Sequence, residues 1–171
     1  MNLKLQLKVL SFLQFFLWGS WLNTFGSYMF ITLRFKGEDI GAVYSTLGIA
    51  ALITSTLFGI VADKWISAKW IYAACHFFGA VTLFIAASIT TPSAMFIVIL
   101  LNSLVYMPTL GLSNTISYYR IQNAGMDIVT EFPPIRIWGT IGFIVAMWAV
   151  SLAGFELSRI TRWRNLTRRK E

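Results

Sequence analysis

The sequence predicts an all-α polytopic membrane protein with about five transmembrane helices. Of its 171 residues, 57% are hydrophobic and only 12% are charged, and the mean hydropathy is +0.67. A typical soluble domain is about 45–50% apolar and about 25% charged. The charged residues are also confined to short stretches, and the uncharged intervals between them are long enough to cross a bilayer as helices. These observations exclude a soluble fold and make the lipid bilayer a partner of the chain.

The uncharged intervals define the expected helices in order. The first follows Lys4 and Lys8 and is too long to be the apolar part of a cleaved secretory signal. One interval is long enough for two crossings, and Pro92 divides it because proline disfavours a helical conformation in the preceding residue. Since backbone amides in hydrocarbon must be bonded within their own segment, we expect helices at about 9–33, 40–62, 70–90, 94–118 and 137–155.

Basic residues in the short loops predict the orientation of the chain, because Lys and Arg are enriched in cytoplasmic loops. With the N-terminus inside, two basic residues fall in outside loops, Arg34 and Lys36. Six fall on the inside: Lys4, Lys8, Lys64, Lys69, Arg120 and Arg136. The sequence therefore predicts a cytoplasmic N-terminus.

The charge balance changes abruptly near the end of the chain. Residues 1–158 hold eight basic and six acidic side chains, whereas residues 159–171 hold six basic and one acidic. The predicted orientation would leave this basic tail outside, against the loop rule. We therefore divide the chain into a partial N-terminal transmembrane bundle, 1–158, and a basic tail, 159–171, and expect a truncated chain. Alternatively, the fifth segment does not cross stably and the tail stays cytoplasmic.

Three of the expected helices carry distinctive faces. In the fourth, Asn102 and Tyr106 belong to a polar face that either lines a cavity or bonds neighbouring helices. In the first, Gln14 and Trp18 share a face that suits a small polar solute with a flat ring, although packing is the alternative. In the second, small residues spaced along one helical face predict a close helix contact, with ligand contact as the alternative: Gly41, Ser45, Gly48, Ser55 and Gly59.

The fifth helix carries the most specific candidate site. Arg136, Thr140 and Phe143 are spaced by four and three residues, which places them on one helical stripe. A guanidinium, a hydroxyl and an aromatic ring in line suit the binding of a polar ring compound. The alternative is that Arg136 only sets the topology and Phe143 only packs.

Titratable groups limit the chemistry of the chain. All carboxylates within residues 1–158 fall in expected loops or at helix ends, and His76 is the one group in a span that titrates near neutral pH. A lone helical histidine is more commonly packed and hydrogen-bonded than a proton relay. The sequence contains no paired nucleophile and base, phosphate loop or Cys/His metal spacing. It therefore predicts neither an enzyme, a metal site, a cofactor nor a nucleic-acid partner.

Several motifs resemble a known transporter family. The segment around Gly59, Asp63 and Lys64, between the second and third helices, resembles a loop motif of the major facilitator superfamily, although Trp65–Ala68 replaces its usual glycine and basic cluster. More specific matches are Leu17–Trp21, Tyr106–Thr109 and Phe132–Phe143. Together they make residues 1–158 similar to the bacterial nucleoside:proton symporter family within that superfamily.

This resemblance implies two six-helix halves in the bacterial inner membrane, which import nucleosides by proton symport. It also implies substrate contacts by Arg136, Thr140 and Phe143, with the proton as coupling ion. The chain would then be an N-terminal fragment, inactive until a C-terminal half or a second copy completes it. Two alternatives remain open: a non-transporting membrane remnant or accessory subunit, and a transporter half for another small polar solute.

The loop motif also predicts a gate at the inner end of the bundle. Asp63 follows the second helix, and Arg120 lies on the same side of the membrane in the predicted topology. An ion pair between them would hold the inside closed. The alternative is a solvated carboxylate, for which an exposed ion pair contributes at most about 1 kcal/mol.

Overall fold

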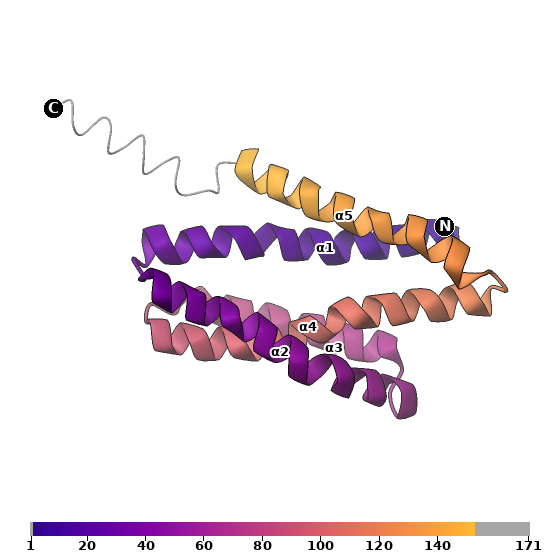
Figure 1. The fold of residues 1–171 in the computed structure, drawn as a ribbon, viewed down its shortest axis with the longest axis horizontal. Helices are drawn as coiled ribbons and strands as arrows, with labels where there is room; N and C mark the ends of the chain where they lie inside the picture. Colours follow the sequence, from indigo (N-terminus) through magenta and orange to yellow (C-terminus); the bar gives the residue numbers. More distant parts are fainter. Residues whose placement is uncertain (1, 153–171) are drawn as a thin grey trace.

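The structure is a computed structural model that describes the backbone of residues 2–152, and the side chains in that range except those of residues 55, 56 and 59–64. The described part is helical throughout its length, apart from short connections (Figure 1). In order, its elements are α1 (Leu3–Ser27), a π-helix η1 (Tyr28–Thr32), α2 (Gly37–Lys64), α3 (Ala68–Ala86), α4 (Pro92–Asn123) and α5 (Ile128–Leu152).

The helices form two groups. α1 packs along α5, while α2 and α3 both pack along α4, and the contact between the groups is smaller (Figure 1). The N-terminus lies at the same end of the bundle as the α2–α3 and α4–α5 connections. The α1–α2 and α3–α4 connections lie at the opposite end. This alternation agrees with a chain that crosses the bundle repeatedly.

Three helices in the described part are long and apolar enough to cross a membrane, namely α3, α4 and α5. The outer faces of the bundle carry large apolar side chains, including Leu52 and Phe84, which are 84% and 81% exposed. Surfaces of this kind mark contact with lipid or with another protein segment. The predicted fold class, an all-α bundle of apolar helices, is therefore confirmed.

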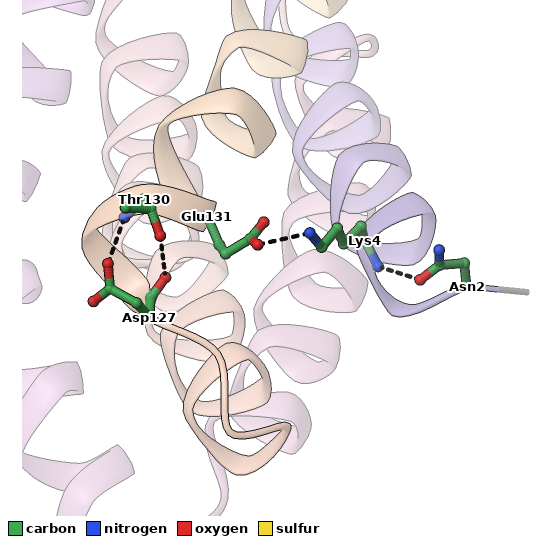
Figure 2. Close-up of polar contacts among 5 residues, drawn as sticks. All are labelled: Asn2, Lys4, Asp127, Thr130 and Glu131. Carbon is green, nitrogen blue, oxygen red and sulfur yellow. Dashed lines mark hydrogen bonds and ion pairs between the residues drawn. The ribbon is translucent and has the colours of Figure 1, made fainter.

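The fifth helix begins earlier than the sequence predicted, at Ile128 instead of residue 137. The side chain of Asp127 accepts a hydrogen bond from the backbone amide of Thr130 (3.0 Å; Figure 2). It also accepts one from the amide of Val129 (3.3 Å), and the two bonds start the helix. Hydrogen bonding from Thr130, through its side chain and amide, and from the Val129 amide lowers the pKa of Asp127. The prediction failed because a charged residue marks the edge of the hydrocarbon, whereas a helix can continue beyond it.

Two further boundaries differ for the same reason. α1 begins at Leu3, where the Asn2 side chain accepts from the amide of Lys4, and α4 continues to Asn123. The predicted end of the fifth span at residue 155 and the tail 159–171 lie outside the described residues.

An ion pair connects the beginnings of α1 and α5. Lys4 Nζ lies 2.6 Å from Glu131 Oε1, and the two side chains are 44% and 26% exposed (Figure 2). The sequence treated Lys4 as a topology signal and Glu131 as a loop carboxylate. Only the early start of α5 places this carboxylate on a helix that faces α1.

The closest helix approach is at the α1–α5 contact. A Cβ built on Gly142 would overlap the backbone carbonyl of Phe12, and one on Gly19 would lie 2.9 Å from the backbone oxygen of Phe143. Small residues permit such approach between helices in lipid. The predicted contact along α2 is not observed in the described part, because no atom lies within 4 Å of a Cβ built on Gly41 or Gly48.

Candidate functional site

A buried glutamine joins three helices in the middle of the bundle. The Gln14 side chain is fully buried. Its amide oxygen accepts from the Tyr72 hydroxyl (2.6 Å) and lies 3.0 Å from His76 Nε2. Its amide nitrogen donates to Thr109 Oγ1 (2.9 Å) and, at 3.5 Å, to the Tyr106 hydroxyl. Gln14 on α1 is thus bonded to both α3 and α4, and a buried amide with all its hydrogen bonds made gives a defined interior.

Asn102 makes a second connection, between α4 and α3. Its amide nitrogen donates to the Gly79 carbonyl (3.0 Å) and to Thr82 Oγ1 (2.8 Å). Its amide oxygen is buried and has no hydrogen-bond partner among the described residues. The sequence left open whether the polar face of α4 lines a cavity or bonds neighbouring helices. In the structure, Asn102 and Tyr106 of this face form hydrogen bonds between helices.

Two of the three residues predicted to contact substrate face α1. The Arg136 guanidinium carbon lies 4.1 Å from the centre of the Phe15 ring, and Arg136 is half-buried. No carboxylate or hydrogen-bond partner of Arg136 is found in the described part of the chain. The Phe143 ring meets the Trp18 ring edge-on, with 5.9 Å between centres. Thr140 is exposed on the same stripe of α5.

A hollow of about 580 Å³ lies between α1, α2 and α5, and Phe143 forms part of its wall. The volume is in the range of small-molecule sites. Polar groups enter it from Asn23, Ser27 and Tyr44; the Tyr44 hydroxyl donates to the Leu22 carbonyl (2.6 Å). Asn23 is not among the predicted site residues. The sequence shows that it is a polar residue of the first helix, but not which other helices pack around it.

The loop motif is only partly described. α2 ends at Lys64, and the side chains of Asp63 and Lys64 lie outside the described set, as does the burial of Gly59. Arg120 is exposed in the last turn of α4 and lines a hollow of about 700 Å³ together with Lys69, at the start of α3. The backbone thus brings the end of α4 close to the α2–α3 connection, while the predicted Asp63–Arg120 pair falls outside what is described.

The described carboxylates lie at or just before the beginnings of helices. Glu38 and Asp39 lie in the first turn of α2 and Glu131 in the first turn of α5. Within the described residues there is no group of three His, Cys, Asp or Glu side chains that could hold a metal ion. The arrangement offers hydrogen bonding, aromatic stacking and the Arg136 guanidinium, which are means of binding a polar solute.

Long helices with apolar outer faces, a bonded polar interior and hollows between the helices define a polytopic membrane protein. Comparison with known proteins specifies the class further. The model of the family described as nucleoside H+ symporter matches residues 1–163. The chain therefore belongs to the nucleoside H+ symporter family.

Similarity to individual proteins agrees with this family assignment. The chain is 76% identical to nucleoside permease NupG of Escherichia coli K12 over 94% of its own length and 38% of the relative's. It is 56% identical to xanthosine permease of the same organism, with the same coverage of both chains. A crystal structure of nucleoside transporter NupG superposes with a TM-score of 0.87 and 77% identity, over 92% of this chain and 39% of that one. The chain thus spans well under half the length of the relatives that it matches.

Proposed function

We propose that this chain forms the N-terminal part of a nucleoside:proton symporter in the bacterial inner membrane, with its N-terminus in the cytoplasm. The observation that carries the proposal is the match to the nucleoside H+ symporter family over residues 1–163, together with 76% identity to a nucleoside permease. The named relatives are permeases, and we propose that this chain likewise has no enzymatic activity. The positive-inside rule supports the orientation.

The proposed substrate contacts are Arg136, Thr140 and Phe143. The guanidinium of Arg136 is held against Phe15 at 4.1 Å, which leaves its planar set of donors available to sugar or base oxygens. Phe143 lines the hollow between α1, α2 and α5, where its ring could stack on a base. Thr140, exposed between them, adds a hydroxyl partner.

A second wall must complete the site. Secondary transporters bind substrate between repeats that move against each other, and this chain covers 38% of the permease that it matches. We propose that a C-terminal half, or a second copy of the chain, supplies that wall and that the chain does not transport alone.

The inner end of the bundle is the proposed gate. Arg120 lines a hollow with Lys69, close to the connection that begins after Lys64. An ion pair of Arg120 with Asp63 would tie α4 to α2 there. Asp63→Asn should then change the transport rate of the completed transporter, and an unchanged rate would favour a solvated carboxylate.

The function is tested by completing the chain. The chain is co-expressed with the part of the E. coli permease that it does not match, and uptake of labelled uridine into vesicles is measured with and without a proton gradient. Gradient-dependent uptake is expected only when both parts are present, and it should fall with Phe143→Ala more than with the control Leu152→Ala, at an exposed position on the same helix. Competition between uridine and xanthosine then tests the solute class.

A non-transporting role, as a membrane remnant or an accessory subunit, is the second candidate. The observation that favours it is the coverage of only 38% of the permease. Assembly of the two co-expressed parts into a stable complex without uridine or xanthosine uptake would support this role and reject the first. Uptake by vesicles that contain only this chain would instead show that copies of it assemble into a transporter.

A further inference from the structure

The hydrogen atoms of the Gln14 cluster can be assigned from its geometry. Thr109 has one hydroxyl hydrogen, and Oγ1 donates it to the Tyr106 carbonyl at 2.6 Å. The same oxygen therefore accepts from Gln14, 2.9 Å away. This fixes the Gln14 amide with its nitrogen toward Thr109, and its oxygen must face Tyr72 and His76. The usual ambiguity of an amide orientation is removed by this neighbour.

The amide orientation in turn fixes the imidazole. An amide oxygen has no hydrogen to give, so His76 Nε2, 3.0 Å from Gln14 Oε1, must be the donor. A neutral imidazole carries a single N–H, and Nδ1 is therefore left with a free lone pair. Among the described residues no hydrogen bond to Nδ1 is present, and the residue is only half-buried.

We propose that His76 is a reversible proton-binding site within the helical bundle, which takes up a proton at Nδ1 while Nε2–H stays bonded to Gln14. The Nδ1 lone pair forms the new N–H bond as a hydronium ion gives up the proton and becomes water. No hydrogen bond within the protein is broken, so the cluster that joins α1, α3 and α4 persists in both protonation states. This proposal deepens the proposed proton symport and rests on it for its role in transport, although proton binding itself is measurable without transport.

The groups around the His76 ring are compatible with reversible protonation. The ring meets Tyr72 of its own helix edge-on at 4.4 Å between centres, and Tyr106 of α4 at 5.9 Å. These tyrosines are the titratable groups against it, and α1 contributes only the uncharged Gln14. No carboxylate or fixed cation contacts the ring among the described residues. These uncharged rings leave the imidazole without a fixed negative charge that would hold a proton on it permanently.

Nitrogen NMR tests the site directly, because the chain contains a single histidine. The complete chain is labelled with ¹⁵N-histidine and placed in lipid nanodiscs. At alkaline pH, Nε2 should give a protonated-type signal and Nδ1 an unprotonated-type signal. On acidification, Nδ1 should convert to the protonated type while Nε2 changes little. The opposite tautomer, or no titration between about pH 4 and pH 9, would overturn the proposal.

A variant tests the hydrogen assignment. Thr109→Val removes the acceptor that orients Gln14, so the amide can turn over and the Nε2–H tautomer should lose its dominance. Thr82→Val, which removes a half-buried threonine hydroxyl bonded to Asn102 instead, is the matched control and should leave the tautomer unchanged. A mixture of tautomers in the control as well would reject the role of Thr109.

The role in transport has a separate readout. In the co-expressed transporter, His76→Gln should weaken the dependence of uridine uptake on the proton gradient at least several-fold, and an unaltered dependence would overturn that role. Failure of the unsubstituted parts to transport would instead reject the proposed function, while the NMR result would still decide whether His76 binds a proton.

Discussion

Gly142→Ala should separate α1 from α5 and destabilise the bundle. A Cβ at this position would overlap the carbonyl oxygen of Phe12 and lie 3.0 Å and 3.1 Å from the carbonyl carbon and Cα of that residue. All three atoms are backbone, so no side-chain rotation relieves the contact. Since carbon atoms pack comfortably at about 3.5 Å or more, the helices must move apart by at least about 0.5 Å.

The expected cost follows from the contact that is disturbed. The α1–α5 contact is the most extensive between two helices in the described part, and it positions Phe15 against Arg136 and Trp18 against Phe143. Overpacking a tight contact costs about 1–3 kcal/mol. Gly48→Ala is the matched control, because a Cβ there meets no atom within 4 Å. A glycine-to-alanine change without a clash should be neutral or slightly stabilising in a helix.

Reversible unfolding measures this difference. The chain in mixed micelles is titrated with a denaturing detergent and followed by tryptophan fluorescence, to which Trp18 at the contact contributes as one of seven tryptophans. The Gly142→Ala midpoint should fall clearly, and the Gly48→Ala midpoint should stay or rise. Equal midpoints for Gly142→Ala and the unsubstituted chain would refute the close approach of α5 to α1.

Three further predictions concern single side chains. Arg136→Lys keeps the charge but loses the planar donors and the stacking on Phe15, so it should weaken uridine competition about tenfold in the completed transporter; unchanged affinity would make Arg136 a topology signal only. A double-mutant cycle of Lys4→Met and Glu131→Gln should give a coupling below about 1 kcal/mol, because the pair is partly exposed; a larger value would contradict this. Asp127→Ala should shorten α5 at its start, whereas Asp127→Asn keeps the cap. The pKa of Asp127 is lowered in the folded chain, so its carboxylate stabilises the start of α5 fully above the unfolded pKa, and this stabilisation is lost as the pH falls through the folded pKa. Helicity measured against pH should show the loss in the unsubstituted chain and not in Asp127→Asn.

Both the sequence and the structure identify the helices, but they disagree on where helices end. Each of the five expected helices overlaps a helix of the described part, because hydrocarbon excludes charge from its interior. The uncharged intervals missed the first turns of α5, where Asp127 caps the helix and Glu131 reaches Lys4. Helical hydrogen bonding depends on the backbone and its caps, and it continues past the point where charged side chains are tolerated.

The candidate site was likewise predicted only in part from the sequence. The spacing of Arg136, Thr140 and Phe143 placed them on one stripe, because residues three and four apart share a helical face. Which helix that stripe meets was undetermined, and only the packed bundle sets Arg136 on Phe15 and Phe143 beside Asn23 and Tyr44.

The sequence by itself determined the class of protein, since composition and hydrophobic length are local properties that the bilayer selects residue by residue. Only the tertiary structure decided the use of its polar side chains. Gln14, His76 and Thr109 are separated by dozens of residues, and no periodicity relates residues on different helices. Their hydrogen bonds exist because α1, α3 and α4 meet at one depth, which is a property of how the helices pack and not of any one of them.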